Sequence, residues 1–244
     1  MPERVAVVTG ASRGIGRAIA VALSADHFVA VNFRSGVEEA KATLSAIEAG
    51  GGQGTIVQAD VSDPAGVDAL FTEVEDLSGP VEVLVNNAGI RRDGLALRMR
   101  DRDWDDVIAT DLTGPFLCAR RAMRSMLRLR FGRIVNMSSI AGLRGNAGQV
   151  NYCAAKAGLI GLTKALAREI GKKGITVNAV APGLVDTDLT AALSDDQRAA
   201  LLQEVPGGRA GRPEDVAAIV SFLCSEAAAN VNGAVLVTDG GMTA

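Results

Sequence analysis

This chain of 244 residues is poor in the residues on which many enzymes build their sites. It has one histidine, one tyrosine, one tryptophan and three cysteines. With His27 as the only histidine, a Ser-His-Asp triad or a zinc site built on several histidines is disfavoured. The cysteines (Cys118, Cys153 and Cys224) are far apart, odd in number and without a CxxC pair. That usage is typical of a reducing compartment, so we expect a cytoplasmic protein without a metal site.

The sequence also lacks a positive net charge and long apolar runs. The formal net charge of −3 argues against a nucleic-acid surface. No apolar run approaches the roughly 18 residues of a membrane helix. After MPER the sequence goes directly into VAVVTG, without the charged-then-apolar stretch of a secretory signal. We therefore expect neither nucleic acid nor a membrane as a partner.

What the sequence does contain is a regular alternation of short apolar runs and longer segments of helical length, such as residues 14–24 and 64–77. Most of the runs are apolar without alternation, as in strands buried on both faces of a parallel sheet. The alternation, unbroken by a linker or repeat, predicts one α/β domain over residues 1–244: a doubly wound, Rossmann-type sheet of seven parallel strands with helices on both faces. The expected strands are RVAVVT (4–9), FVAVNF (28–33), GTIVQA (54–59), VEVLVN (81–86), GRIVNM (132–137), GITVNAVA (174–181) and AVLVTDG (234–240).

A glycine-rich turn, TGASRGIG (9–16), joins the first expected strand to the first helix. Gly10, Gly14 and Gly16 allow a tight turn, close approach of the backbone to a pyrophosphate, and close packing of helix on strand. The N–H groups at the helix start then face the phosphates. A plain tight turn is the alternative, but the position after the first strand of a βα alternation favours a dinucleotide site.

The end of the second strand indicates which dinucleotide binds. An NAD site usually has an acid here, which holds the ribose 2′-hydroxyl. This strand ends in VNFRSG, with Arg34 in place of an acid and Arg13 nearby in the glycine turn. Two guanidinium groups suit a 2′-phosphate, so NADP(H) is predicted. The alternative is a pair of solvated surface arginines.

Three further strand ends carry residues suited to the same crevice. Asp60, followed by Val61, can accept a hydrogen bond from the adenine amino group. The motifs NNAG (86–89) and APG (181–183) supply Gly89 and Gly183, which let the backbone pass close to a ribose or nicotinamide.

The single tyrosine, Tyr152, stands four residues before Lys156 in NYCAAK (151–156). Residues at i and i+4 share one helix face. An ammonium group about 4 Å from a phenol favours the phenolate by roughly 4 kcal/mol before desolvation, which makes proton transfer useful at neutral pH. A half-buried packing role is the alternative, and we favour an acid.

These motifs, in this order, resemble the short-chain dehydrogenase/reductase superfamily: TGxxxGIG, NNAG, a serine thirteen residues before YxxxK, and the late PG. They span nearly the whole chain. Three longer stretches look most like the bacterial beta-ketoacyl-acyl carrier protein reductases: LSDDQRAALL, NYCAAKAGLIGLTKALARE and VNGAVLVTDGGM. The resemblance implies a homotetrameric enzyme of fatty acid biosynthesis that reduces a 3-oxoacyl thioester with NADPH.

The resemblance also implies a role for each motif residue. Ser139 binds and orients the substrate carbonyl, Tyr152 donates the proton, and Lys156 supports Tyr152 and holds the nicotinamide ribose. Thr187 matches the residue that holds the carboxamide. The cofactor-binding residues expected in all are Gly10, Ser12, Arg13, Gly14, Ile15, Gly16, Arg34, Asp60, Val61, Asn87, Ala88, Gly89, Tyr152, Lys156, Pro182, Gly183, Val185 and Thr187.

One catalytic position departs from the family pattern. The family usually has Asn in an NxxG motif, where this chain reads ATDLTG with Asp111. In the family that residue holds a proton-relay water, largely by its main-chain carbonyl. Pro115 has no N–H to donate to the Asp111 carbonyl and is expected to kink the helix, which leaves the carbonyl for the water. We therefore expect a competent site in which the side chain itself matters little, with a possible negative charge near Lys156.

Basic residues gather after the middle of the chain, at Arg120, Arg121, Arg124, Arg128, Arg130 and Arg133. The pattern favours a solvated or subunit-facing helix surface with salt links. The alternative is a dock for an acidic partner, joined by Lys172 and Lys173. The resemblance supports docking of an acyl carrier protein, because Arg130 and Lys173 match family positions that flank the active-site entrance.

Two other functions stay open. One is a polyketide or small-carbonyl ketoreductase of the same family. The other, of a different class, is a dinucleotide-binding regulatory protein without turnover, which only Asp111 supports. The segment 186–211 is expected to cover the substrate and to set acyl-chain length and stereochemistry, neither of which the sequence specifies.

Overall fold

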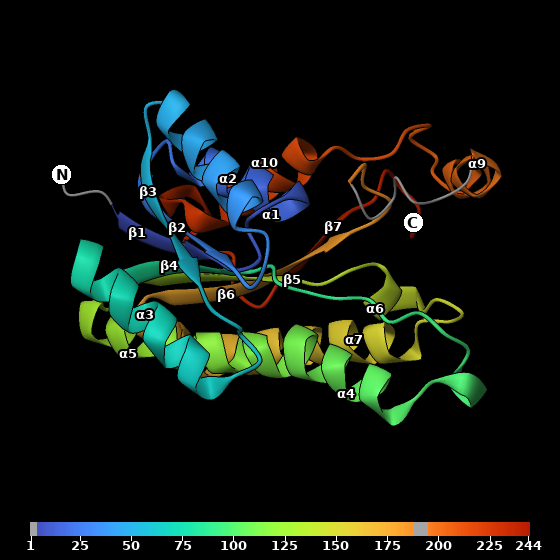
Figure 1. Ribbon diagram of the computed structural model, residues 1–244, viewed down its shortest axis with the longest axis horizontal. Helices are drawn as coiled ribbons and strands as arrows, with labels where there is room; N and C mark the ends of the chain where they lie inside the picture. The colour runs from blue at the N-terminus through green and yellow to red at the C-terminus, as the bar shows by residue number, and fades with distance from the viewer. Residues whose placement is uncertain (1–3, 188–194) are drawn as a thin grey trace.

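The computed structural model describes residues 4–187 and 195–244, and its centre is one parallel sheet of seven strands (Figure 1). The predicted sheet is confirmed, with each strand end within two residues of its expected place. The strands are β1 (Arg4–Val8), β2 (His27–Phe33), β3 (Gln53–Gln58), β4 (Val81–Asn86), β5 (Gly132–Met137), β6 (Ile175–Pro182) and β7 (Val235–Thr238).

The strand order is β3-β2-β1-β4-β5-β6-β7. The chain runs outward from β1 to β3, then crosses to β4 and runs outward to β7. The direction of winding therefore reverses between β1 and β4, where Val8 pairs with Val85. Beyond the carboxyl ends of these two strands lies the crevice in which such sheets bind ligands.

Helices cover both faces of the sheet (Figure 1). On one face, apolar side chains such as Ile19, Ile47 and Val220 form one buried cluster with the strands, and on the other face Phe71 and Met126 belong to a second. The first layer contains α1 (Gly14–Leu23), α2 (Val37–Ala49) and α10 (Pro213–Cys224). The second contains α3 (Pro64–Ser78), α4 (Asp101–Ile108), α5 (Gly114–Leu129) and α7 (Val150–Ile170).

Two short helices, α6 (Ala141–Arg144) and α9 (Asp195–Gln203), lie at the carboxyl end of the sheet, at the right of Figure 1. Single 3₁₀ turns occur at Ala96–Arg98, Gly171–Lys173 and Glu226–Ala228. No helix of the described residues is both long and apolar enough to pass through a bilayer. Within the same residues, no cluster of three or more His, Cys, Asp or Glu side chains is arranged for a metal ion.

The interruption expected at Pro115 is present. Between α4 and α5 the chain makes one π-helical turn, Ala109–Thr113, closed by a hydrogen bond from the Gly114 N–H to the Ala109 carbonyl. Pro115 follows as a buried residue in the first turn of α5. Because a π turn inserts an extra residue, it rotates the preceding side chains relative to α5. Thr110 and Asp111 of this turn are both buried, and Asp111 is completely inaccessible to solvent.

Candidate active site

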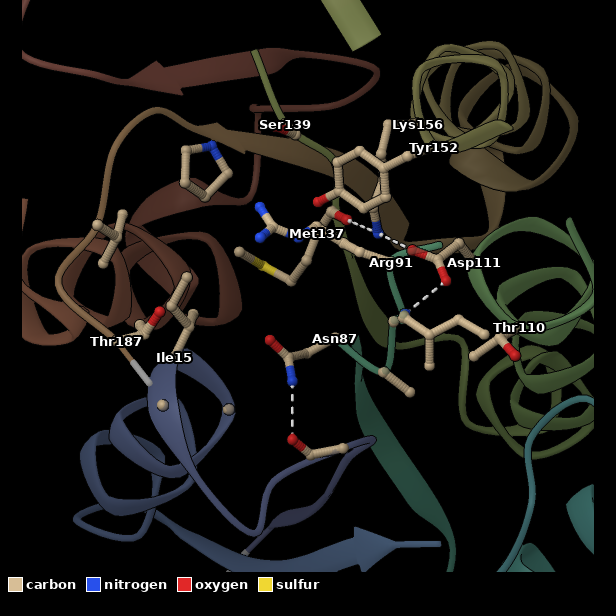
Figure 2. Close-up of a pocket in the computed structure, with 18 of the residues that line it drawn as sticks. Ile15, Asn87, Arg91, Thr110, Asp111, Met137, Ser139, Tyr152, Lys156 and Thr187 are labelled. Carbon is tan, nitrogen blue, oxygen red and sulfur yellow. Dashed lines mark hydrogen bonds and ion pairs between the residues drawn. The ribbon is translucent and has the colours of Figure 1, made fainter. Parts of the chain in front are cut away.

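A cavity of about 720 Å³ lies at the carboxyl ends of the strands (Figure 2). Every residue assigned from the sequence to the cofactor or to catalysis lines this one cavity, from Gly10 in the glycine turn to Thr187 after β6. The parallel sheet gathers them because each follows the end of a strand or sits on a helix that packs beside one. Their individual roles stay predictions.

Two glycines of the turn make close contacts that leave no room for a side chain. A Cβ on Gly10, whose φ is +62°, would lie 2.8 Å from Ala88 Cα, and one on Gly16 would lie 2.5 Å from Asn87 Nδ2. Gly14 also has a positive φ, and the Thr187 methyl group lies 3.6 Å from its Cβ position. Thr187 is thus brought close to the turn, and its role toward the carboxamide stays a prediction.

Side chains of the neighbouring strand ends lock the turn in place. The Thr9 hydroxyl accepts hydrogen bonds from the N–H groups of Asn87 and Ala88, both at 3.0 Å. Asn87 Nδ2 donates to the carbonyls of Thr9 (2.9 Å) and Gly10 (3.0 Å). Asn32 bridges the turn to the end of β3: its Oδ1 accepts from the Gly10 N–H, and its Nδ2 donates to the carbonyls of Val57 and Ala59. Sequence reasoning missed Thr9 and Asn32 because their partners are distant in the chain.

The start of α1 is suited to an anion. Its N-cap residue, Arg13, makes no side-chain cap, and the first turn carries no acid. By contrast, α3 begins with Asp63, whose carboxylate accepts from the N–H groups of Ala65 and Gly66. The first N–H groups of α1 are therefore left to a ligand, and an N-terminus of this kind favours phosphate.

The part of the cavity just beyond β2 and β3 carries the predicted arginines. Arg13 and Arg34 both line it, and Arg34 Nη1 lies 3.6 Å from Asp60 Oδ2 with both side chains partly exposed. The other Asp60 oxygen accepts from the Ser62 N–H (2.9 Å) and hydroxyl (2.7 Å). Burial raises the pKa of Asp60, but Ser62 and Arg34 outweigh it and the net pKa is lowered. Glu39, which sequence reasoning did not weigh, also lines this part.

Opposite the glycine turn, Lys156 is the centre of a buried polar cluster (Figure 2). Its ammonium lies 3.1 Å from Asp111 Oδ2, donates to the Met137 carbonyl at 3.0 Å, and stands 5.4 Å from the centre of the Tyr152 ring. Burial alone lowers the pKa of Lys156. The Asp111 carboxylate and, after it, Tyr152 more than offset this, so the pKa of Lys156 is raised. Lys156 is therefore held as a cation beside the phenol.

The carboxylate of Asp111 does more in the structure than the sequence indicates. One oxygen pairs with Lys156, and the other accepts from the Ile90 N–H at 2.8 Å. Gly89 permits this contact, because a Cβ there would lie 2.7 Å from Asp111 Oδ2. Sequence reasoning assigned the work of this residue to its main-chain carbonyl. The side chain also ties the NNAG loop to the lysine.

The residues around Tyr152 hold the start of α7 against the loops. Ser138, next to Ser139, donates to the Lys156 carbonyl at 2.9 Å and so fixes the end of β5 to α7. The Ser139 oxygen accepts from the Ala141 N–H at 3.2 Å, which leaves its proton for a substrate carbonyl. Asn151, completely buried, donates to the carbonyls of Arg92 and Asp103. These anchors were missed from the sequence.

The expected cover over the substrate is only partly described. Residues 188–194 of the segment 186–211 lie outside the described residues. In the remainder, Leu201 of α9 lines the cavity, and Glu204 Oε2 lies 2.9 Å from Arg144 Nη2, which joins the segment to α6 after Ser139.

Arg130 and Lys173 do not flank the cavity within this chain. They immediately precede β5 and β6 and so lie at the amino ends of these strands, whereas the cavity is at the carboxyl ends. β5 alone separates the two ends by about 20 Å, at roughly 3.3 Å per residue. The expectation of an entrance site is therefore not met within one copy. Arg121 is nearly buried and pairs with Asp68 and Glu75 of α3, in agreement with the salt links predicted for this helix.

Comparison with known proteins places these features in a family. Residues 10–243 match the family described as Enoyl-(Acyl carrier protein) reductase. The chain is 46% identical over 239 residues to the 3-oxoacyl-[acyl-carrier-protein] reductase FabG of Escherichia coli K12, covering 98% of this chain and 97% of that protein. It is 49% identical over 238 residues to FabG of Staphylococcus aureus Mu50 (97% of each). For FabG of Salmonella typhimurium LT2 the identity is 47% over 239 residues (98% and 97%).

Proposed function

This chain belongs to the short-chain dehydrogenase/reductase family, and we propose that it reduces 3-oxoacyl thioesters to 3-hydroxyacyl thioesters with NADPH, as a step of fatty acid biosynthesis. One observation carries the proposal. The Tyr152–Lys156–Asp111 cluster and Ser139 line the same cavity as an uncapped helix start and a glycine turn with no room for a side chain at Gly10 or Gly16. An acid and a dinucleotide site in one cavity are what carbonyl reduction requires.

The cavity fits a nicotinamide dinucleotide phosphate. The start of α1 and the glycine turn would hold the pyrophosphate, and Arg13 and Arg34 would hold the 2′-phosphate. Gly89 and Gly183 would let the backbone pass close to the ribose and nicotinamide, and Asn87 lines the same cavity. When bound, the cofactor supplies the hydride that forms the new C–H bond at the ketone carbon.

The residues of this chain supply the other half of the reaction. Ser139 donates a hydrogen bond to the ketone oxygen and orients it, and Tyr152 gives that oxygen its proton as the carbonyl becomes an alcohol. The Lys156 cation stabilises the phenolate left on Tyr152. Asp111 keeps Lys156 charged in a buried place, and its main-chain carbonyl is the proposed site of the proton-relay water.

The names found in the comparisons describe reduction of two different bonds, a carbonyl and a carbon–carbon double bond. The three relatives named above, at 46–49% identity, are 3-oxoacyl reductases. The paired hydroxyl groups of Ser139 and Tyr152 also favour the carbonyl, since they serve an oxygen that gains charge and a proton. We therefore propose the ketone as the reacting group.

A direct assay tests the proposal. Protein mixed with NADPH and acetoacetyl-CoA should consume NADPH, whereas crotonyl-CoA, which offers only a double bond, should leave it unchanged. Consumption with crotonyl-CoA alone would assign the chain to enoyl reduction. Binding of NADPH without turnover of either thioester would favour the regulatory alternative. A polyketide or small-carbonyl substrate is the second candidate within the enzyme class, and a panel of ketones and thioesters of graded length would separate it.

We propose that the enzyme is cytoplasmic. We also propose that an acidic acyl carrier protein, docking on Arg130 and Lys173, carries its physiological substrate. These residues lie at the end of the sheet opposite the cavity. We therefore propose that the dock and the cavity that receives the acyl chain belong to different copies within a homotetramer.

A further inference from the structure

Arg91, which no motif singled out, lines the catalytic cavity, and its backbone is held rigidly on both sides. On one side the Ile90 N–H donates to Asp111 at 2.8 Å, and on the other Asn151 Nδ2 donates to the Arg92 carbonyl at 3.1 Å. Asp93 is in turn held by Gln149 Nε2, 3.1 Å from each carboxylate oxygen. This loop is thus fixed between the Lys156–Asp111 pair and the start of α7.

The guanidinium group of Arg91 has N–H donors that make no hydrogen bond to the described residues. In the described residues its only ion-pair partner is Asp93, at 3.9 Å, which exceeds hydrogen-bond distance. Its five N–H donors therefore have no close acceptor in that part of the chain. Figure 2 shows the side chain pointing into the cavity, on the side of the Tyr152 hydroxyl. A cation with unused donors near the acid is suited to a substrate oxygen.

The chemistry of the proposed substrate identifies that oxygen. A 3-oxoacyl thioester has two carbonyl oxygens separated by one methylene group. The ketone oxygen is assigned to Ser139 and Tyr152, so the thioester oxygen must lie close by in the same cavity. Ser139 and Tyr152 have no further donor to offer it.

We propose that Arg91 donates a hydrogen bond to the thioester carbonyl of the substrate and so selects 3-oxoacyl thioesters over isolated ketones, an inference that rests on the proposed function. The guanidinium fixes the thioester group, which sets the ketone between Ser139 and Tyr152. A ketone without the second carbonyl leaves the donors of Arg91 unused and gains nothing from them.

Two substrates that differ only in the thioester carbonyl group test this inference. Acetoacetyl-CoA and S-(3-oxobutyl)-CoA both carry the ketone, but in the second a CH₂ group replaces the thioester carbonyl. Arg91→Ala should lower kcat/KM for acetoacetyl-CoA at least about tenfold, the usual size of a hydrogen bond from a charged donor. It should change the value for the thioether less than about twofold, and leave the Kd of NADPH unchanged. If the thioether binds without turnover, its inhibition constant serves in place of kcat/KM.

The matched control is Arg92→Ala, since Arg92 is the next residue, pairs with Asp106 at the same 3.9 Å and does not line the cavity. It should affect both substrates equally and little. Three results for Arg91→Ala would overturn the inference: equal losses of kcat/KM on both substrates, an unchanged kcat/KM for acetoacetyl-CoA, or weaker binding of NADPH. A wild-type protein that ignores acetoacetyl-CoA would instead overturn the proposed function.

Discussion

The Lys156 ammonium and the Asp111 carboxylate form a buried ion pair 3.1 Å apart, with 5% and 0% of the two side chains exposed. Burying two charges is costly, and such a pair persists only when further hydrogen bonds satisfy it. The Met137 carbonyl and the Ile90 N–H supply them. The pair therefore fixes the lysine beside Tyr152 and ties the NNAG loop to it.

The first prediction concerns this pair. Asp111→Asn keeps an acceptor for the Ile90 N–H but removes the charge that raises the pKa of Lys156, so burial will lower that pKa. We expect the alkaline limb of the pH–rate profile to move to lower pH, with modest loss of rate near pH 7. Asp111→Ala should cost more, about 3–5 kcal/mol of folding stability, because it leaves Lys156 charged and unpaired. If the alkaline limb of the pH–rate profile stays in place, the Asp111 carboxylate has no electrostatic role in catalysis.

The stability of these variants should depend on pH in a defined direction. Because the pKa of Lys156 is raised on folding from 10.5, the pair stabilises the wild type fully below that pH. The contribution is lost as pH rises through the folded-state pKa. The difference in Tm between wild type and Asp111→Asn should thus be widest near neutral pH and narrow above about pH 10.5. A constant difference across the range would contradict this linkage.

The acid itself gives the next prediction. Tyr152→Phe removes one hydroxyl group. The hydrogen bond from the N–H of residue 152 to Asn151 Oδ1, at the start of α7, remains. Turnover of acetoacetyl-CoA should fall at least about 10²-fold, the usual contribution of a general acid, while the Kd of NADPH changes little. Fluorescence titration with NADPH serves as the folding control. Turnover at the wild-type level would exclude Tyr152 as the acid.

Cofactor choice is proposed to depend on Arg34, which lines the cavity just after β2. Arg34→Asp should weaken NADPH and relatively favour NADH, because it replaces a guanidinium by a carboxylate where the 2′-phosphate is proposed to bind. The matched control is Arg17→Asp, which makes the same charge change on an exposed residue of α1 outside the cavity. The measurement is the ratio of kcat/KM for the two cofactors. If the ratio of kcat/KM shifted equally in both variants, the effect would come from the change in net charge and not from the position of Arg34.

The sequence predicts most of this molecule because its strongest signals are local. Seven apolar runs mark the strands, and strand topology then carries Gly10, Asn87, Ser139 and Gly183 to one edge. Contacts between distant residues leave no such pattern. The hydrogen bond between Thr9 and Asn87 joins residues 78 positions apart. The hydrogen bond between Ile90 and Asp111 depends on a π turn. Pro115 predicts an interruption of the helix there but not its geometry. Arg130 is a different case: a residue just before a parallel strand lies opposite the ligand crevice, so its place was open to prediction.

The last prediction concerns the carrier protein, and it follows from that placement. Gly174, next to Lys173, packs against the Arg130 carbonyl, so the two basic residues form one patch at the amino ends of β5 and β6. Changing both to Glu should raise KM for a carrier-bound 3-oxoacyl substrate roughly tenfold at low salt, and less at high salt, since the attraction is screened. The uncharged N-acetylcysteamine thioester should be unaffected. Arg17→Glu with Lys41→Glu, on the other face of the sheet, makes the same charge change and should alter neither substrate.

If the dock serves the cavity of another copy, the two functions can be separated and recombined. A Tyr152→Phe chain keeps its dock but has no acid, and a chain with Arg130→Glu and Lys173→Glu keeps its acid but has no dock. Each alone should turn over carrier-bound substrate poorly. Oligomers assembled from both by co-expression should regain a substantial part of the wild-type rate, because an intact dock then faces an intact cavity. Hybrid oligomers no faster than the average of the two parents would show that dock and cavity belong to one chain, or that the carrier binds elsewhere.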